Sequence, residues 1–563
     1  MIDLVMRTRY VSFIQSKTAH IVGLLALGAA ITSVMNGFAL DDVHILVNNP
    51  RIHSLSNIWT LFGQSYWPPE QGGALYRPLT ILAFMIQWAI GGGSPLPFHL
   101  VNVALYIAVC IALFRLLRLL VDEHIAFLAG AIFAVHPVHV EAVANIVGQA
   151  ELVVGLLTFL TMERYVRARL SGNFTTADKI VIVLSYFAAC MFKEHAIILP
   201  ALLASCEIVL PDEGKTLVER ARRLTGLFLG LAVAGVIFVA LRTLVGGELR
   251  SGGTNELFSG EAYGARVLTM LTIVPEWLRL FFWPASLSAD YSFPRTRLAT
   301  SFSLEMIPGL IVLISGLLIA FKMRRDKPIV SFSFAWIAIT MAIPSNLIMT
   351  TGFVLAERTL FLASAGVALL AAAAAFTLHK AVQDSRHGRL TFHAAVVAVL
   401  ILGLVRSGVR MPVWANNLTL FTQTVADAPL SAHAHWMLAE TLEKAGRRND
   451  AADEMLKAVV LGRKNDFILL GYGGDLLARG GMCNRAMPLY RRALALTPQN
   501  QILRSNAALC LIELRKPQEA RTLALAGGEG NQLLPQLAST LHLADSLTQL
   551  RTSASPVAGY VSN

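Results

Sequence analysis

Leu224–Leu241 reads LTGLFLGLAVAGVIFVAL, a run that contains no charged residue. A helix that crosses the ~30 Å hydrocarbon core of a bilayer needs about 20 predominantly apolar residues. Similar uncharged runs recur along the chain, at Met306–Phe321, Ile329–Pro344 and Thr359–Leu378. A soluble helix is rarely apolar around its whole circumference, because one face meets water. The repeated runs therefore predict a membrane protein with many spans.

Composition indicates the same class. The chain has 563 residues, of which 55% are hydrophobic and 15% charged, and its mean hydropathy is +0.58. Ordinary soluble domains are less apolar and more highly charged. The basic residues behind the net charge of +11 stand in short clusters beside the apolar runs. Such clusters are typical of loops that face anionic lipid headgroups, so no nucleic-acid partner is predicted.

The positive-inside rule orders the spans. Basic residues precede the first apolar run, which predicts a cytoplasmic N-terminus and a retained signal anchor. Pro78–Ile90 is interpreted as a helix at the outer interface and Ala265–Pro284 as an interfacial or re-entrant helix, because counting them as spans would place basic clusters outside. About eleven spans remain, at residues 19–38, 98–118, 124–138, 149–164, 178–192, 195–210, 224–243, 304–321, 329–346, 357–378 and 391–407. An odd number places the C-terminal region outside the cytoplasm.

The C-terminal region carries an internal repeat of about 35 residues. Ala439, Leu442, Gly446, Ala451 and Ala458 recur as Gly474, Leu477, Gly481, Ala486 and Ala493, and a weaker third copy has Ala508, Leu511 and Ala520. Small residues at these offsets let two antiparallel helices pack closely, which resembles tetratricopeptide repeats. Two unrelated amphipathic helix pairs are the alternative. Stacked repeats form a surface that binds peptides or partner proteins.

Three regions are therefore predicted. Residues 1–410 form a membrane domain with a catalytic outer loop at about 39–97, and residues 411–540 form a repeat domain on the non-cytoplasmic side. Residues 541–563 form a disordered tail. Cys483 and Cys510 both fall in the repeat domain and can pair if it faces an oxidising compartment, a question that the sequence leaves open.

Polar residues in a membrane domain are costly to bury, so they indicate function. Asp41 and Asp42 follow the first span directly. Two adjacent carboxylates can act as a general base and its partner, or can hold a cation. The alternative is a cap at the end of the span, for which a single Asp would be enough.

A second polar group begins at the end of the third predicted span. It contains His136, His139, Glu141 and Glu151. Two histidines and a carboxylate can ligate a metal. Their spacing matches no strong metal signature, and Pro137 would end a helix there. A hydrogen-bonded junction between two helices is therefore the other interpretation.

Charges also interrupt two apolar segments further along. Lys193 and Glu194 stand in the middle of Ile180–Leu210, which indicates a turn between helices or a polar cavity. Lys193 can pair with a lipid phosphate or with Glu194. Glu357 and Arg358 open another span. The planar guanidinium suits a phosphate anion, although a contact with Glu357 or snorkelling would also explain it.

One more carboxylate, Asp290, follows an apolar and aromatic run at residues 277–283. Tryptophans in that run are typical of the aromatic belt at a membrane interface. The belt does not explain the aspartate, so Asp290 is retained as a candidate site residue.

Taken in order, the motifs resemble a known family. The opening motifs are Leu40-Asp41-Asp42, Asn48-Asn49-Pro50, Tyr76-Arg77-Pro78-Leu79-Thr80 and Phe98-His99-Leu100-Val101-Asn102. The series continues with Phe133–Val143, Gly148–Leu152, Lys193-Glu194, Leu287–Ser292, Pro344–Asn346 and Ala356–Arg358. This order resembles the transmembrane and tetratricopeptide-repeat O-mannosyltransferases of the C-type glycosyltransferase (GT-C) superfamily. The resemblance covers nearly the whole chain.

The resemblance implies an all-α, polytopic GT-C fold and a glycosyltransferase that uses a polyprenyl-phosphate-linked sugar, usually mannose. The implied acceptor is a Ser or Thr hydroxyl of a protein outside the cytoplasm. Asp41 would be the catalytic base and Asp42 its neighbour in the catalytic motif, while Lys193 and Arg358 would bind the donor phosphate. The residues expected to line the cavity are His136, His139, Glu141, Glu151, Glu194, Asp290 and Glu357.

Two departures from the family pattern affect these expectations. Gln149 stands where the family commonly has Arg, which removes one contact to a phosphate. The repeat array has only about three units, so acceptor recognition is expected to be different or less extensive.

Other functions stay open at this stage. The same fold could act on a lipid or cell-wall glycan acceptor, and a non-enzymatic scaffold could recruit partners through the repeats. The scaffold leaves the outer polar residues unexplained. No cofactor is certain, and the sequence does not decide whether a divalent metal is needed. We expect a bacterial inner membrane with the repeats in the periplasm, or the endoplasmic reticulum membrane if the source is eukaryotic.

Overall fold

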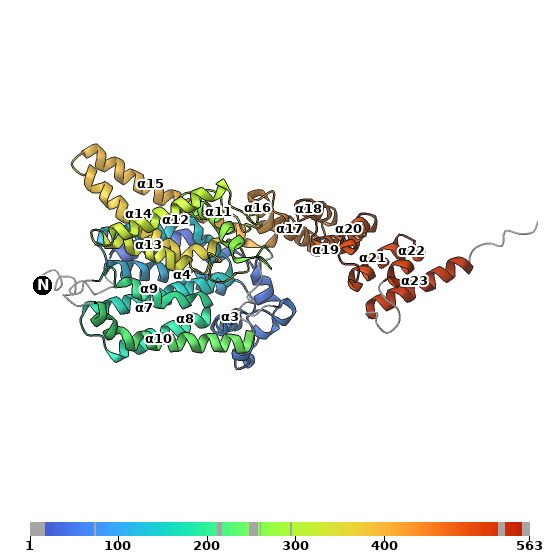
Figure 1. Ribbon diagram of the computed structural model, residues 1–563, viewed down its shortest axis with the longest axis horizontal. Coiled ribbons are helices and arrows are strands. Elements are labelled where there is room, and N and C mark those ends of the chain that lie inside the picture. Colours follow the sequence, from blue (N-terminus) through green and yellow to red (C-terminus); the bar gives the residue numbers. More distant parts are fainter. Residues whose placement is uncertain are drawn as a thin grey trace, which may run out of the picture. The chain divides into compact units, whose positions relative to one another are not determined.

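The chain is built from helices that form two units. The computed structural model describes residues 17–72, 75–210, 217–246, 257–258, 260–292, 296–526 and 535–553, and these residues contain no strand. The first unit comprises residues 1–291 and 296–420, and the second comprises residues 292–295 and 421–563 (Figure 1). The all-α class predicted from the sequence is therefore confirmed.

The first unit contains the candidate membrane-spanning helices together with shorter ones. Their bounds are α2 (Lys17–Ala30), α3 (Pro78–Gly91), α4 (Leu96–Arg118), α5 (Glu123–Val135), α6 (Val140–Ala144), α7 (Gln149–Leu170), α8 (Thr176–Phe192), α9 (Leu199–Cys206), α10 (Leu217–Gly246), α11 (Tyr263–Phe282), α12 (Ile307–Met323), α13 (Pro328–Met341), α14 (Phe361–Val382) and α15 (Arg386–Arg410). A further helix, α16 (Asn417–Asp427), crosses the boundary between the units. Figure 1 shows the long helices of this unit running side by side.

Seven helices in the described part of the chain are long and apolar enough to cross a membrane. They match the predicted spans 19–38, 98–118, 149–164, 224–243, 304–321, 357–378 and 391–407. The predicted span 124–138 is a bent pair, Glu123–Val135 with Pro137–Ala144, broken by 51°. The other three predicted spans are also helical but shorter, as α8, α13 and Glu194–Cys206. The multi-pass architecture is therefore confirmed.

The two segments interpreted as interfacial are helices as well. Pro78–Ile90 is α3, which begins with Pro at its first position and ends where Gly92 adopts a left-handed φ of 57°. Ala265–Pro284 is α11, which contains Pro275. Their depth in a membrane stays a prediction.

The second unit consists of helix pairs. Its helices are α17 (Ala432–Lys444), α18 (Arg448–Leu461), α19 (Phe467–Arg479), α20 (Cys483–Leu496), α21 (Gln501–Glu513), α22 (Pro517–Leu525) and α23 (Pro535–Ser553). Gly446 lies in the turn between α17 and α18, and Gly481 lies in the equivalent turn between α19 and α20, with φ of 76° and 74°. Residues with a side chain would be strained there. The first part of the tail predicted to be disordered lies in α23, and residues 554–563 lie outside the described residues.

A disulfide joins two helices of this unit. Cys483 at the start of α20 is bonded to Cys510 on α21, with their Cα atoms 5.2 Å apart. Cys110, Cys190 and Cys206 are free and buried in the membrane unit. The structure thus pairs the two cysteines whose pairing the sequence leaves open.

Candidate active site

The loop after the first span is anchored by Asp42. Its carboxylate is fully buried and accepts the N–H groups of Ile146 and Val147 at 3.2 and 2.9 Å. Burial raises the pKa of Asp42 to about 7, although the N–H donors act to lower it. Leu40, two residues earlier, turns the chain with a left-handed φ of 54°. Asp42 therefore positions the loop, while the neighbouring Asp41 keeps a side chain that is 26% exposed.

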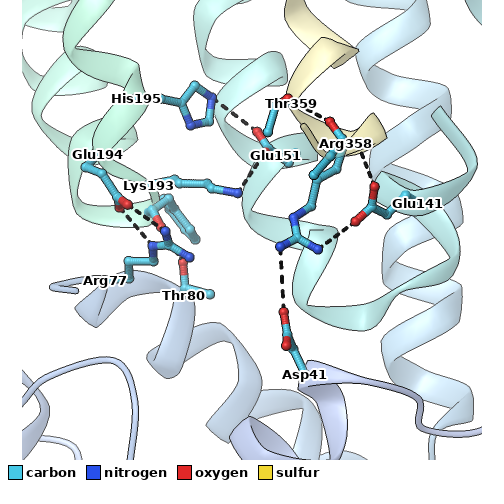
Figure 2. Close-up of polar contacts among 12 residues, drawn as sticks. Asp41, Arg77, Thr80, Glu141, Glu151, Lys193, Glu194, His195, Arg358 and Thr359 are labelled. Carbon is cyan, nitrogen blue, oxygen red and sulfur yellow. Dashed lines mark hydrogen bonds and ion pairs between the residues drawn. The ribbon is translucent and has the colours of Figure 1, made fainter. Parts of the chain in front are cut away.

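Arg358 connects Asp41 to a buried carboxylate. Its backbone N–H donates to Glu141 Oε2 at 2.9 Å, and its Nη1 donates to Glu141 Oε1 at 2.7 Å. Its Nη2 lies 3.8 Å from Asp41 Oδ2 (Figure 2). Glu141 is brought here by the break between α5 and α6, which lets α6 turn by 51° from the direction of α5. A residue pair 217 positions apart in the sequence is thus fixed by two hydrogen bonds.

A second cation faces the same space. Lys193 lies between the end of α8 and the turn Glu194–Ile198, in an extended conformation that ends the helix. Its Nζ contacts Glu151 Oε1 at 2.5 Å, and His195 Nε2 lies 3.2 Å from the other oxygen of Glu151. Figure 2 shows Lys193 and Arg358 extending from opposite sides toward the space between Glu151 and Asp41.

Arg77 is the third cation. It directly precedes Pro78, the first residue of α3, and its guanidinium forms a two-bond pair with Glu194 at 2.8 and 2.6 Å. The guanidinium carbon lies 4.9 Å from the centre of the buried Tyr66 ring. Thr80 Oγ1 donates to the Phe192 carbonyl at 2.6 Å, which ties the start of α3 to the end of α8.

The three cations are each mostly buried and each paired with a carboxylate. Arg77, Lys193 and Arg358 have side chains that are only 12 to 16% exposed, and each contacts a carboxylate within 2.7 Å. Buried charges of this kind are retained only where they are paired. Guanidinium and ammonium groups are the donors that bind phosphate, and the carboxylate of Asp41 can take a proton. The arrangement therefore suits an anionic leaving group beside a hydroxyl nucleophile.

Two of the other predicted residues form a separate cluster. Glu357 Oε1 accepts the Ser288 N–H at 2.6 Å and the Tyr291 hydroxyl at 2.7 Å, so it fastens the segment after α11. The N–H of Asp290 donates to Ser288 Oγ at 3.2 Å. Glu357 directly precedes Arg358 in the chain, so the cluster adjoins the cation of the site in sequence.

His136 and His139 have structural partners. His139 contacts the Tyr106 hydroxyl at 2.9 Å through Nδ1 and the Ser364 hydroxyl at 2.7 Å through Nε2. His136 Nε2 contacts the Phe281 carbonyl at 2.9 Å. These contacts favour the helix-junction interpretation. The described residues contain no group of three or more His, Cys, Asp or Glu side chains that could hold a metal ion.

The sequence did not assign a role to three residues that the structure brings to the site. Arg77 and Thr80 belong to the motif Tyr76-Arg77-Pro78-Leu79-Thr80, and an Arg before a helix-starting Pro is the signal that points to Arg77. His195 follows the two charges at 193 and 194. Gln149 lies elsewhere, in a buried network of amides with Gln87 and Asn102 at 2.8 and 2.9 Å.

Known proteins are similar to this chain in sequence. Protein O-mannosyl-transferase TMTC4 of Mus musculus is 26% identical over 487 residues, which cover 77% of this chain and 64% of that protein. Protein O-mannosyl-transferase F38B6.6 of Caenorhabditis elegans is 26% identical over 439 residues, which cover 75% and 60%. The chain is similar to the TMTC protein O-mannosyltransferases. The resemblance identified from the ordered motifs is thus confirmed.

The match covers only part of the length of these relatives. The chain spans less than two thirds of the length of these relatives, and no protein-family model matches it. Among solved structures, an oligosaccharyltransferase of Archaeoglobus fulgidus has a TM-score of 0.42 and 13% sequence identity, covering 79% of this chain and 59% of that chain.

Proposed function

We propose that the protein transfers a sugar, most simply mannose, from a polyprenyl-phosphate donor to Ser or Thr hydroxyls of proteins outside the cytoplasm. The observation that carries the proposal is the placement of Asp41, whose carboxylate lies 3.8 Å from Arg358 Nη2 in a site that also contains Lys193. The relatives named protein O-mannosyl-transferase support the reaction class.

The chemistry follows from the donor. The acceptor oxygen forms a bond to the anomeric carbon while the bond from that carbon to the phosphate oxygen breaks, and the configuration inverts. The hydroxyl proton passes to the Asp41 carboxylate. The electron pair of the broken bond leaves with the phosphate, whose charge Arg358 and Lys193 stabilise. Glu141 and Glu151 hold these two cations in place.

The disulfide supports a non-cytoplasmic position for the repeats. Disulfides persist in the periplasm, the endoplasmic reticulum lumen and other oxidising compartments, and they are rare in the cytosol. Cys483 and Cys510 form one in the second unit. This agrees with the odd number of spans predicted from the sequence. The cited relatives are animal proteins, so a bacterial source gains no support from them.

The first test compares wild type with Asp41→Asn in membranes supplied with radiolabelled polyprenyl-phosphate mannose. Wild type is expected to produce labelled protein, and the variant is expected to lose the label although it accumulates normally. Glu70→Gln is the matched control, because Glu70 is an exposed acid in the same outer loop. Its label should equal that of wild type.

The other outcomes are informative. Equal labelling in wild type and Asp41→Asn would remove Asp41 from the mechanism. Label in the lipid or glycan fraction instead of protein would favour the alternative acceptor class. No label in any fraction would reject mannose on polyprenyl phosphate as the donor.

A further inference from the structure

One face of the repeats gathers aromatic rings and carboxylates. The ring centre of Trp436 on α17 lies 5.2 Å from that of Tyr472 on α19, and Tyr472 is 49% exposed. Trp436 Nε1 donates to Glu440 Oε1 at 3.0 Å, which fixes a carboxylate beside the rings. We define the aromatic–acidic patch as Trp436, Tyr472, Glu440, Glu443, Asp475 and Arg479.

The patch has an excess of negative charge. Arg479 donates two hydrogen bonds to Glu443, at 2.7 and 2.9 Å. The hydrogen bond to Glu443 raises the pKa of Arg479, and the charges of Asp475 and Glu440 add to that effect. With three carboxylates and one guanidinium, the residues of the patch carry two more negative than positive charges.

The acidic groups are held in place before any partner binds. Asp475 Oδ1 accepts the Tyr490 hydroxyl at 2.6 Å and the Asn506 amide at 2.8 Å, so α20 and α21 both fix its position. Exposed apolar side chains extend the face on α19 and α21, where Ile468 is 44% and Ile502 53% exposed. A preorganised surface loses little entropy when it binds an extended chain.

We propose that the aromatic–acidic patch binds a lysine- or arginine-containing extended segment of the acceptor polypeptide. The inference rests on the proposed function for the identity of the acceptor. An ammonium or guanidinium group is attracted to the faces of Trp436 and Tyr472 and to the charges of Glu440 and Asp475. The same charges repel an acidic segment. A sugar could stack on the rings and donate hydroxyl hydrogen bonds to the carboxylates, but it carries no positive charge to match the excess negative charge of the patch.

The test measures binding rather than transfer, so it is independent of catalytic activity. The full-length protein is placed in nanodiscs of zwitterionic phosphatidylcholine, which does not attract a cationic peptide. Three fluorescent Ser/Thr-containing peptides of one sequence are titrated by anisotropy: one with lysines, one with norleucine in their place, and an O-mannosylated form of the norleucine peptide.

The lysine peptide is expected to bind, and its Kd should rise when salt is raised from 50 to 300 mM. Glu440→Gln and Asp475→Asn should each weaken it about threefold to tenfold, because each removes a charge but keeps the oxygen that accepts the neighbouring hydrogen bonds. Asp453→Asn is the matched control. Asp453 is an exposed acid on α18 that pairs with Arg485 at 3.0 Å, so this variant should bind as wild type does.

Three results would overturn the inference. Equal binding of the lysine and norleucine peptides would show that charge is not recognised. Binding of the mannosylated peptide alone would show that the face recognises a glycan. An equal loss in Asp453→Asn and Glu440→Gln would show that the patch is not the site. Glu440→Gln and Asp475→Asn are isosteric, so a loss of binding in either variant reports the lost charge and not a loss of fold.

Discussion

Arg358 contacts two carboxylates, because its Nη1 lies 2.7 Å from Glu141 and its Nη2 lies 3.8 Å from Asp41. Lysine carries the same charge but has no planar fork of donors. Arg358→Lys is expected to raise the KM for the polyprenyl-phosphate donor about tenfold, which corresponds to the loss of one charged hydrogen bond. Initial rates against donor concentration measure this. Arg118→Lys is the control, because Arg118 at the end of α4 lies 3.7 Å from Glu123 and not beside a carboxylate of the site. An unchanged KM in Arg358→Lys would exclude a role in donor binding.

Asp42 makes the stability of the folded protein depend on pH, and the direction of this dependence follows from the burial of its carboxyl group. Burial raises its pKa from 3.8 to about 7. The folded protein therefore holds this proton more tightly than the unfolded chain does. The stabilising contribution is complete below a pH of about 4 and is lost as the pH rises to about 7.

Asparagine cannot ionise, so Asp42→Asn should remove this component. The decline of the unfolding temperature between about pH 4 and pH 7 is expected to be smaller in the variant than in wild type. Thermal unfolding of each purified protein in detergent at several pH values gives the slope of unfolding temperature against pH for wild type and for the variant. Identical slopes would show that Asp42 does not titrate in this interval.

The sequence identifies two of the three cations of the site, but it misses Arg77 and does not show which carboxylate each cation contacts. Lys193 and Arg358 are recognisable because each interrupts or borders an apolar segment, where a charge is costly. Glu151 lies 42 residues from Lys193, and Glu141 lies 217 residues from Arg358. Only the packing of α6 and α7 against the later helices brings these carboxylates to the cations. Ion pairs between residues so far apart in the sequence depend on tertiary structure, which local sequence patterns do not specify.

At the scale of elements, hydropathy predicts helices more reliably than it predicts breaks. Residues 125–135 are apolar throughout, and residues 124–138 are predicted as one span, yet the chain bends by 51° where α5 ends and α6 begins. Pro137 marks the position of the break in the sequence. The angle depends on tertiary contacts, which a hydropathy profile cannot show. Among them are the hydrogen-bond contacts of His139 with Tyr106 and Ser364.

Small residues between the repeat helices permit a prediction at this scale. A Cβ atom at Gly474 would lie 2.6 Å from the ring of Tyr490. This ring is buried, and its hydroxyl donates a hydrogen bond to Asp475. Gly474→Ala should therefore destabilise the repeat unit by about 1–3 kcal/mol, despite the better helix propensity of alanine. Urea titration followed by proteolysis of this unit in the full-length protein measures the change.

The matched control is Gly480→Ala at the end of the same helix. A Cβ atom there would have its nearest neighbour at 3.3 Å, and the backbone φ is −75°. Its stability should stay within about 0.5 kcal/mol of wild type. Equal stability of Gly474→Ala and wild type would contradict the close packing of α19 on α20.

At the scale of the whole molecule, the cysteines connect topology to function. Cys483 and Cys510 form a disulfide in the second unit, whereas Cys110, Cys190 and Cys206 are free in the first. If the repeats lie outside the cytoplasm, protein taken from intact membranes should contain this one bond. We expect unreduced peptide mapping, after denaturation in an alkylating agent, to recover the peptides of Cys483 and Cys510 as one linked species.

The three free cysteines act as internal controls in this experiment, since all should be alkylated without reduction. Reduction should separate the linked peptides and restore two alkylation sites. Alkylated Cys483 and Cys510 in the unreduced sample would instead place the repeats in a reducing compartment. That result would contradict the odd number of spans and the proposed non-cytoplasmic acceptor together, because both require the second unit to face the oxidising side.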